Sequence, residues 1–446
     1  MIHRWNRALG AMLLMSIAAA STFAHPTTGP LPQSAVVAFV GGTVVPMDRE
    51  RLLPDHTVLV RNGTIESVGP RSAVAVPPGA TIVDAEGRYL MPGLADMHTH
   101  VQYVEDLLPY TAHGVTTILN MGGASALTRW REQIRLGQIV GPQVLLGWFV
   151  DGEGGAGGVV LSVEAARDAV RQAAASGYEY IKVYNSLSTA QFDAIAEEAA
   201  RRSISVIGHG VRDPGMQHIL ENGMRLVAHG EEFIYTYFGN VPDRRRIPAA
   251  AELVRRTGAY VLPNLSTYEI ISIQWGKPSM VDQFFERPES RFQHPGHRRT
   301  WARRRYADRI GSIEDRLVFL RDMTKAFADA GVPLLTGTDS PGIPGMYPGP
   351  SMHDDLRNFV IAGLTPYQAL SAATRVPGEF VAATTTDRQP FGTIAPGQRA
   401  DLILLRANPL ESVDAVRALD GVMAAGRWYP PEFVLEQMLE MASRWL

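Results

Sequence analysis

His98 and His100 are the residues whose types and spacing point most directly to chemistry. They close the apolar run Tyr89-Leu-Met-Pro-Gly-Leu-Ala-Asp-Met-His-Thr-His100, which has the composition of a strand. Residues i and i+2 of a strand point to the same side, so the two imidazoles can hold one metal ion. Zinc accepts imidazole nitrogen at about 2.0–2.1 Å. Two exposed histidines at a strand end would give the same pattern, so the argument needs further residues.

Four more residues that can bind a metal stand at the ends of later apolar runs. They are Lys182 in Tyr180-Ile-Lys-Val-Tyr184, His209 after Val206-Ile-Gly, His229 after Val227-Ala, and Asp339 after Leu334-Leu-Thr-Gly-Thr. Taken singly, they could be a core lysine, two hydrogen-bonded core histidines and a loop cap. Burying an unpaired charge costs several kcal/mol, and a shared metal centre would explain all four. The joint pattern therefore predicts a metal site.

These residues need elements that bring the strand ends together. Beyond about residue 90 the chain alternates short apolar runs with helical patterns, at Val163–Ser176, Thr189–Arg202, Pro248–Thr257, Ile313–Ala330 and Thr365–Ala373. This alternation predicts an α/β fold with parallel strands, and eight such units would close a barrel. Barrel enzymes carry their chemistry at the carboxyl ends of the strands, where the six metal-capable residues stand.

Two segments are expected to form loops over the barrel mouth. The run from Asp151 to Gly158 is rich in glycine and therefore flexible by composition. Residues 277–309 carry many arginines around Trp301. This second segment is either a lid or a solvated helical face.

Both ends of the mature chain have β character. Short β-rich runs fill residues 36–83, and Asn62-Gly63 between two of them predicts a tight hairpin. Residues 391–420 are β-rich again, which predicts a small domain built from both chain ends or, as the alternative, an independent hairpin. We therefore assign residues 34–90 and 386–430 to the small domain, 91–385 to the barrel and 431–446 to a terminal helix.

The first 24 residues have the features of a secretory signal. Arg4 and Arg7 precede an apolar stretch over residues 8–20, and Thr22-Phe-Ala24 is a small-x-small cleavage site. The stretch is short for a membrane span, which needs about 20 residues, so a membrane anchor is the less favoured alternative. We expect cleavage after Ala24, export of the mature chain to the periplasm, and no stable membrane insertion.

Composition narrows the chemistry further. The chain has 446 residues, 46% of them hydrophobic, which suffices for a large buried core and a smaller second domain. Lys and Arg total 42 against 45 Asp and Glu, a net charge of −3, which offers no general attraction for nucleic acid. Cysteine is absent, which excludes disulfides and thiolate ligands. Any metal must be bound by His, Asp, Glu or a modified Lys.

Several motifs together resemble the amidohydrolase superfamily of metal-dependent hydrolases. They are Met91-Pro-Gly-Leu-Ala-Asp-Met-His-Thr-His100, Thr336-Gly-Thr-Asp339, Gly363-Leu-Thr-Pro366 with Ala369-Leu-Ser-Ala-Ala-Thr374, and Gly392-Thr-Ile-Ala-Pro-Gly-Gln-Arg-Ala-Asp-Leu402. The chain looks closest to the imidazolonepropionase-like branch, which includes secreted dipeptidases and amide hydrolases. The resemblance implies a distorted (β/α)8 TIM barrel with a small composite β-sandwich domain.

The resemblance also implies a role for each metal-capable residue. Two divalent ions are expected, with zinc as the default, although ligand type alone does not exclude manganese, cobalt or iron. The more buried ion would be held by His98, His100 and Asp339, and the second by His209 and His229. Lys182, N-carboxylated by carbon dioxide, would bridge the two ions. Asn120 stands where the family often has an acidic residue.

Hydrolysis of an amide C–N bond by metal-activated hydroxide is the reaction that the resemblance implies. The small-molecule substrates would be dipeptides or N-acyl amino acids, with Asp339 as general base and then general acid. Tyr184 and Tyr268 are candidates for a hydrogen bond to the carbonyl oxygen. Tyr103, Arg212, Tyr268 and Tyr347 are the candidates for substrate binding, and Arg212 could hold a carboxylate. Aromatic packing and a surface arginine are the alternatives. The sequence is compatible with a homo-oligomer.

Three other functions stay open from the sequence. The same site could hydrolyse a cyclic amide or a lactone, or the chain could be a non-catalytic binding homologue, although no ligand position is lost. Deamination is the least favoured. Deaminases of the superfamily usually have an acidic residue shortly after the fifth-strand histidine, where this chain has Gly210-Val-Arg212. They also generally lack the bridging lysine, which is present here as Lys182.

Overall fold

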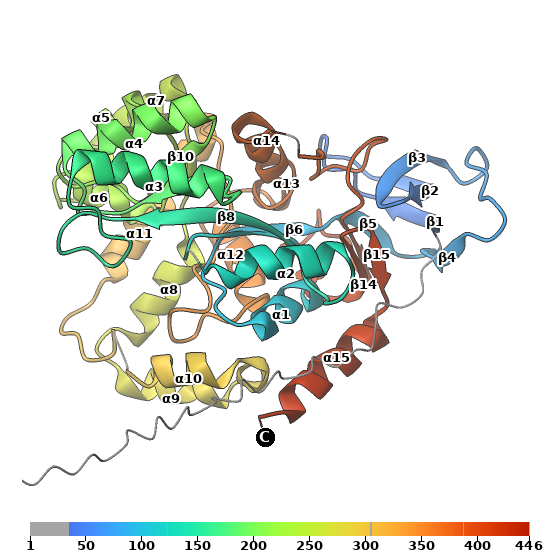
Figure 1. Cartoon of the computed structure of the whole chain (residues 1–446). Coiled ribbons are helices and arrows are strands. Elements are labelled where there is room, and N and C mark those ends of the chain that lie inside the picture. The colour runs from blue at the N-terminus through green and yellow to red at the C-terminus, as the bar shows by residue number, and fades with distance from the viewer. Residues whose placement is uncertain (1–34, 123, 304–305, 387, 446) are drawn as a thin grey trace, which may run out of the picture.

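The computed structural model describes residues 35–446, apart from residues 123, 304–305, 387 and 446. This part of the chain forms two sheets, one parallel and surrounded by helices, the other mixed and set beside it (Figure 1). The expected signal segment, residues 1–24, lies outside the described residues. No helix in the described ranges is long and apolar enough to cross a membrane.

Seven parallel strands form most of the expected barrel, in the order β12-β11-β10-β9-β8-β7-β6. They are β6 (Leu94–Thr99), β7 (Val115–Asn120), β8 (Gln143–Val150), β9 (Tyr180–Val183), β10 (Ser205–Gly208), β11 (Met224–Ala228) and β12 (Tyr260–Leu262). Nearly all of their residues are buried, on both faces of the sheet. Such continuous burial is typical of parallel strands that are covered by helices.

The segment that leads to Asp339 closes the barrel between the first and last strands of this sheet. Leu334 pairs with Val261 of β12, and Ser340 pairs with Thr99 of β6, both in parallel orientation. The eighth strand is therefore present as isolated bridges rather than as a regular strand. Asp339 has a left-handed backbone, with φ of 58°, which no extended strand accommodates. The barrel is distorted at this position.

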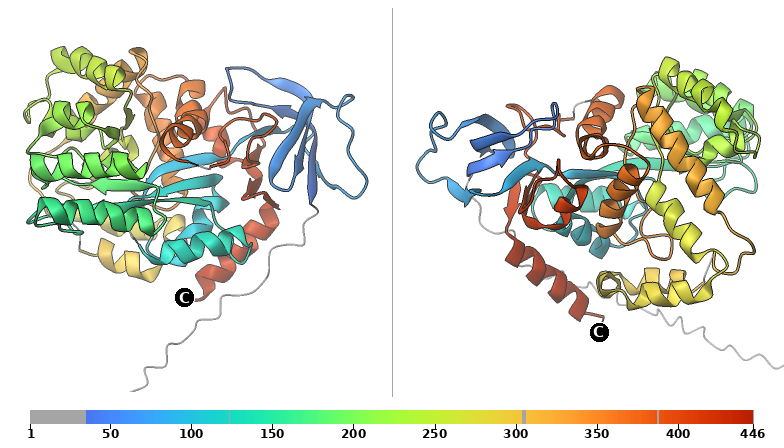
Figure 2. Two further views of the ribbon diagram at one scale, coloured as in Figure 1. Left: turned by 45° about the horizontal axis from the view of Figure 1, so that its top comes forward. Right: turned by 180° about the vertical axis from the view of Figure 1, so that it is seen from behind.

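Helices cover the outside of the barrel (Figures 1 and 2). Those between the strands are η1 (Val104–Asp106), α1 (Leu107–Ala112), α2 (Ala126–Arg135), α3 (Val163–Ala175), α4 (Thr189–Arg202), α5 (Gly215–Glu221), α6 (Glu231–Thr236), η2 (Arg244–Arg246) and α7 (Ile247–Thr257). After β12 come α8 (Leu265–Gln274), α9 (Pro278–Glu286), η3 (Pro288–Phe292), α10 (Pro295–Trp301), α11 (Glu314–Asp329), α12 (Pro350–Ile361), α13 (Pro366–Ala372) and α14 (Arg375–Thr384). The five helices that the sequence predicts are confirmed as α3, α4, α7, α11 and α13, each to within one residue.

Helix α4 shows why these boundaries were readable. Ser188 accepts a hydrogen bond from the N–H of Gln191, and the Gln191 side chain accepts one from the N–H of Ser188. This capping box fixes the start of the helix. Phe192, Ile195 and Ala199 then recur at intervals of three and four residues and are buried, as expected for a helix that packs one face on a sheet.

The second sheet is built from both chain ends, as the sequence predicts. Its strands are β1 (Val36–Val44), β2 (Leu53–Arg61), β3 (Thr64–Pro70), β4 (Thr81–Asp84), β5 (Tyr89–Pro92), β13 (Leu402–Leu405), β14 (Leu419–Ala424) and β15 (Arg427–Tyr429), with η4 (Val413–Arg417) before β14. Strand β1 pairs with β2 along its whole length, and on its other edge it pairs first with β4 and then with β5. Strand β5 in turn pairs with β13. The alternative of an independent C-terminal hairpin is therefore wrong.

The predicted hairpin at Asn62-Gly63 joins β2 to β3. Both residues have positive φ, 49° and 77°, the backbone of the tight turn that this dipeptide favours. The terminal helix α15 (Pro431–Ser443) packs on β14, α1 and η3, and it runs along one side of the barrel below the small sheet (Figure 2).

Residues 277–309, here called the insertion, contain α9, η3 and α10. The insertion is not a solvated helical face throughout, because Trp301 is fully buried and its Nε1–H donates to the carbonyl of Pro341 at 2.9 Å. This bond lies two residues after Asp339. The insertion therefore packs against the segment that closes the barrel.

The closing segment approaches β6 so closely that only glycine fits at position 337. A Cβ atom there would lie 2.9 Å from the backbone nitrogen of His98 and 2.7 Å from a side-chain carbon of Leu262. We expect Gly337→Ala to lower the free energy of unfolding by about 1–3 kcal/mol, the usual cost of overpacking, as measured by denaturant titration. The matched control is Gly157→Ala, whose nearest neighbour would lie at 3.5 Å. Equal stabilities of the two variants would contradict this account of the seam.

Candidate metal centre

Three of the predicted ligands converge at the mouth of the barrel, namely His98, His100 and Asp339. The Nε2 atoms of the two histidines are 3.2 Å apart. Asp339 Oδ1 lies 2.8 Å from His100 Nε2 and 3.4 Å from His98 Nε2. His98 is fully buried, whereas His100 and Asp339 are partly open to the cavity described below.

These separations fit the coordination shell of a metal ion. Ligand atoms held tetrahedrally at about 2.0–2.1 Å from zinc stand roughly 3.3 Å from one another. The buried Nδ1 of His98 has no hydrogen-bond partner among the described residues, so the ring is not held there by a conventional bond. Imidazole nitrogen and carboxylate oxygen suit zinc and other first-row divalent ions. The residues present therefore fit a divalent metal ion.

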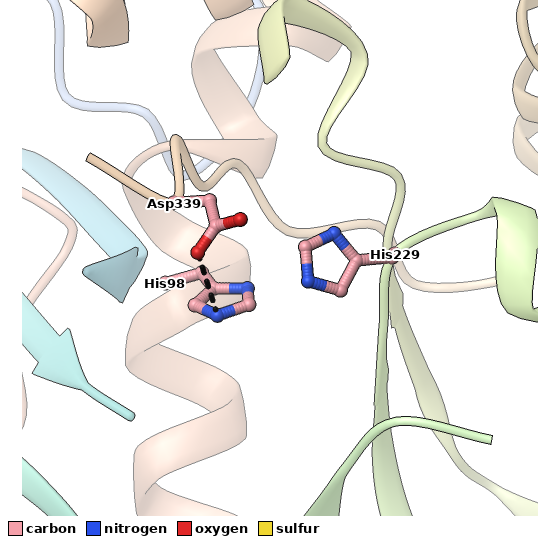
Figure 3. Close-up of side chains that lie close together, drawn as sticks. All are labelled: His98, His229 and Asp339. Carbon is pink, nitrogen blue, oxygen red and sulfur yellow. Dashed lines mark ion pairs between the residues drawn. The ribbon is translucent and has the colours of Figure 1, made fainter. Parts of the chain in front are cut away.

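His229 extends this cluster from the end of β11 (Figure 3). One ligand atom each from His98, His229 and Asp339 lies within 4.8 Å of the other two. The backbone of His229 is left-handed, with φ of 71°, and its N–H donates to the carbonyl of Leu262 at 2.9 Å. Such conformations cost about 1–3 kcal/mol in a non-glycine residue and cluster at functional sites. Asp339 has the same feature.

His209 and Lys182 complete the set of six. The ring of His209 lies 4.5 Å from that of His229, centre to centre. Lys182 is 1% exposed, and its Nζ lies 4.7 Å from the ring centre of Phe149 and 4.6 Å from that of Tyr184. Aromatic faces attract such a buried cation. His100, Lys182, His209, His229 and Asp339 line one cavity, and His98 lies beside Asp339 and His229. The metal that each would bind stays a prediction.

Burial keeps the histidines neutral, which is the form that binds a metal. Desolvation lowers the pKa of His229 to about 4 and that of His98 and His209 well below the ordinary value of 6.5. Burial alone would raise the pKa of Asp339, but His98 and His100 outweigh it and hold that pKa below its usual value. At neutral pH the neutral imidazoles of His98, His209 and His229 and the ionised carboxylate of Asp339 are therefore available.

Burial lowers the pKa of Lys182 as it lowers that of the histidines. This pKa falls to about 8, although the carboxylates of Asp339, Glu232 and Asp151 work to raise it. A lysine in water has a pKa of about 10.4. The amine of Lys182 is therefore neutral in a substantial fraction of molecules at physiological pH.

A layer of hydrogen bonds beneath the centre fixes the ligands. Asp96 accepts from the N–H of Thr338 at 3.0 Å, the hydroxyl of Thr338 at 2.6 Å and the N–H of His98 at 3.3 Å. Asn120 accepts from the N–H of Val101 at 2.6 Å through its side-chain oxygen. The residue that stands in place of the family's acidic group thus orients the loop just after His100.

A cavity of about 380 Å³ opens over the cluster. Its lining residues are His100, Gln102, Phe149, Ala156, Lys182, Tyr184, Asn185, His209, Arg212, His229, Glu231, Glu232, Tyr235, Thr267, Ile271, Tyr306, Asp339, Gly342 and Ile343. This volume lies at the lower end of the range typical of small-molecule sites, about 300–1,000 Å³. The glycine-rich run contributes Ala156 to the wall, so it reaches the mouth as expected.

Two of the predicted pocket residues, Tyr184 and Arg212, line this cavity. The guanidinium of Arg212 lies 4.3 Å from the ring centre of Tyr235, and its Nη2 lies 3.9 Å from a carboxylate oxygen of Glu232. Tyr268 stands behind the wall, 5% exposed, and its hydroxyl is engaged in a hydrogen bond with Tyr235.

Tyr103 and Tyr347 lie outside the lining of the cavity, as the described residues define it. The ring of Tyr103 stacks on that of His294 at 3.6 Å. The hydroxyl of Tyr347 donates to the carbonyl of Phe284, and its ring packs 5.1 Å from that of Trp301. Both tyrosines therefore contact the insertion, in line with the packing role that the sequence left open, and their part in substrate binding stays a prediction.

The sequence analysis did not single out Glu231 and Glu232, which also line the cavity. Burial raises the pKa of Glu231 to about 8 and that of Glu232 to about 7. Two consecutive acids directly after a strand-end histidine were the available signal. The sequence predicts that the segment after His229 contributes to the pocket wall, and the structure shows which of its side chains do so.

Sequence comparison finds local similarity to known enzymes. A segment of 110 residues is 34% identical to an adenine deaminase of Rubrobacter xylanophilus, covering 21% of this chain and 18% of that protein. A segment of 50 residues is 50% identical to an imidazolonepropionase of Klebsiella pneumoniae, covering 11% of this chain and 12% of that protein. The chain thus aligns with less than a fifth of the length of these relatives.

Structural comparison covers far more of the molecule. The structure of bottromycin amidohydrolase superposes with a TM-score of 0.73 at 24% sequence identity, over 93% of this chain and 91% of that one. At this identity the likeness establishes the fold. Residues 89–429, well over half of the chain, match the model of the amidohydrolase family. The distorted barrel, the composite sheet and this match together show that the chain belongs to the amidohydrolase family of hydrolases.

Proposed function

We propose that this protein is a metal-dependent hydrolase that cleaves the amide C–N bond of a small molecule, such as a dipeptide or an N-acyl amino acid. One observation carries the proposal: His98, His100 and Asp339 converge within 3.4 Å at the floor of an accessible cavity. The family membership supports C–N bond hydrolysis. The size of the cavity supports a small substrate.

The residues divide into two groups around the proposed metals. His98, His100 and Asp339 would hold the more buried ion, and His209 with His229 the second. When bound, a divalent ion supplies Lewis acidity that polarises a carbonyl oxygen and lowers the pKa of water toward about 7. Zinc is the default, since neutral imidazoles predominate among the ligands.

Asp339 is placed to move the proton. Its Oδ1 is the oxygen nearest both histidines, so we assign the proton to Oδ2. Water attacks the carbonyl carbon of the amide while its proton passes to Oδ2 of Asp339. The same proton then moves to the nitrogen as the C–N bond breaks, which yields a carboxylic acid and an amine. The depressed pKa of Asp339 keeps this group ionised before the step.

Lys182 would act as a carboxylate rather than as an ammonium. Its neutral amine adds to carbon dioxide, the new N–C bond forms, and one proton leaves the nitrogen. An ammonium at this position would repel metal ions, whereas the carbamate offers two oxygen ligands. The buried position and the pKa of about 8 favour this modification because only the neutral amine reacts.

Tyr184 is the better of the two candidates for a hydrogen bond to the substrate carbonyl. It lines the cavity, and its ring lies 4.0 Å from that of His209. Tyr268 lies behind the wall with its hydroxyl already engaged by Tyr235. A hydrogen-bond donor at the cavity wall can stabilise the charge that develops on the carbonyl oxygen.

We further propose that the mature protein works outside the cytoplasm, in the periplasm. The basic and apolar pattern of residues 1–24 supports export. The chain contains no cysteine, so its fold is independent of the redox state of the compartment.

Replacing the proposed proton carrier should separate catalysis from metal binding. We expect Asp339→Asn to reduce kcat by about 10²–10⁴, the usual contribution of a general acid–base group, while elemental analysis still finds some metal. The matched control is Asp329→Asn on the surface of α11, where the side chain is 58% exposed. A rate close to that of the unaltered enzyme would remove Asp339 from this role.

Removing the proposed bridge should affect the second metal above all. We expect Lys182→Ala to lower the metal content from about two ions per chain to about one, because His209 and His229 lose a shared ligand. A short carboxylic acid added to the buffer should restore part of the activity by occupying the vacated space. Lys325→Ala, at an exposed position of α11, serves as the control. Unchanged metal content in Lys182→Ala would rule out the bridge.

The carbamate should depend on pH in a defined direction. In metal-free protein with dissolved carbon dioxide held constant, the ¹³C NMR signal of a carbamate is expected to rise as pH passes through about 8. Below that value the ammonium has no lone pair, and above it the neutral amine predominates. The signal should be missing in Lys182→Ala. A signal that persists in this variant, or one without pH dependence, would assign the carbamate elsewhere.

A further inference from the structure

Glu231 and Glu232 open helix α6 directly after the proposed ligand His229, and both line the cavity. Their side chains differ in one respect, which is whether the protein itself supplies partners for the charge. Comparing the two carboxylates therefore shows which one is paired within the protein and which one is left to pair with a ligand.

Glu232 is satisfied within the protein. The side-chain amide of Asn185 donates to both of its oxygens, at 3.1 and 3.2 Å. Arg212 adds a charge at 3.9 Å. Glu232 is 3% exposed, and a buried carboxylate of this kind needs such partners to remain stable.

Glu231 is not satisfied in the same way. Its Oε2 is buried and has no hydrogen-bond partner among the described residues. The charges that act most strongly on it are two further carboxylates, Glu232 and Asp339, and the cation of Arg212. A buried carboxylate oxygen left without a donor destabilises the folded protein. A ligand that brings a donor and a positive charge would remove this destabilisation.

Arg212 is already paired with other residues of the cavity wall. Arg212 stacks on Tyr235 at 4.3 Å and faces Glu232, so it does not supply the missing partner of Glu231. The terminal torsion of a glutamate side chain is broad, so a small rotation of the carboxylate turns either oxygen toward the cavity. The partner that Glu231 lacks is therefore a positively charged hydrogen-bond donor.

The position of Glu231 also fits a particular place on the substrate. It follows His229 by two residues, so the two Cα atoms lie within about 8 Å of each other. In a dipeptide the α-ammonium is separated from the scissile carbonyl carbon by one carbon atom. A carbonyl held at the metal centre thus brings that ammonium to the side of the cavity where Glu231 stands.

We propose that Glu231 binds the free ammonium group of the substrate, and that the substrates are small amides with a free amine, such as dipeptides, rather than N-acyl amino acids. This inference rests on the amide hydrolysis proposed above. It assigns Glu231 to substrate recognition, whereas Glu232 holds Asn185 and Arg212 in place.

The test uses three compounds that share one scissile bond. Glycyl-leucine carries the ammonium, glycolyl-leucine replaces it with a neutral hydroxyl, and acetyl-leucine replaces it with hydrogen. For the metal-loaded enzyme we expect kcat/KM to be roughly tenfold to a hundredfold higher for the first compound than for the third, the range of a hydrogen bond to a charged group. Glu231→Gln should abolish this preference, and Glu231→Asp should retain part of it.

The controls separate recognition from folding. Glu252→Gln makes the same change on the surface of α7, where the side chain is 55% exposed, and should keep the preference. Glu231→Gln should unfold at a denaturant concentration no lower than that of the unaltered protein, because glutamine keeps the size of the side chain and brings no charge into the wall. A stability loss together with an unchanged preference would mean that Glu231 is structural and would overturn the inference.

Failure of the inference and failure of the proposed function give different results. Equal cleavage of the three compounds, or faster cleavage of acetyl-leucine, would overturn the role of Glu231 and leave amide hydrolysis intact. Cleavage of none of them, over several leaving amino acids, would remove the proposed function. Calorimetric binding of glycyl-leucine and acetyl-leucine then decides on Glu231, since tighter binding of the former supports the ammonium site and equal binding overturns it.

Discussion

The site depends on the seam where the segment around Asp339 closes the barrel against β6. The N–H of Asp339 donates to the carbonyl of His98 at 2.7 Å, and the N–H of His100 donates to the carbonyl of Ser340 at the same distance. These bonds place the carboxylate directly over the two imidazoles. They form only because Gly337 allows the two backbones to touch. The same backbone contacts thus close the barrel and position the proposed metal ligands.

Much of this arrangement was predictable from the sequence because it follows from short-range patterns along the chain. The two-residue repeat of a strand put His98 and His100 on one side, and the end of an apolar run marked His209 and His229 as belonging to the mouth. Asp339 was recognised by its position but not by its conformation. Its left-handed backbone is set by contacts with β6, which lies far away in the sequence.

The predictions that the structure supports least concern the walls of the cavity. Tyr103 and Tyr347 were chosen because they follow strand ends or loops, yet both pack against the insertion. The reason is a buried pair, His297 and Asp106, joined at 2.8 Å, in which Asp106 also accepts from the N–H of Gln102 at 3.0 Å. This pair anchors the insertion to the loop after His100. No short-range sequence pattern predicts a contact between residues so far apart in the chain.

The balance of charge links the metal centre to the wall. Neutral histidines add nothing to it, so the carboxylate of Asp339 and the state of Lys182 decide the sign of the field at the floor. The proposed carboxylation of Lys182 would turn a cation into an anion, which would remove the repulsion toward metal ions and offset part of their charge. Metal ions bound at the floor would attract a carbonyl oxygen, while the carboxyl group of Glu231 on the wall would ionise when a cationic ligand approaches it. A substrate that carries a carbonyl next to an ammonium would be complementary to both, because the carbonyl oxygen would face the proposed metals and the ammonium would face Glu231.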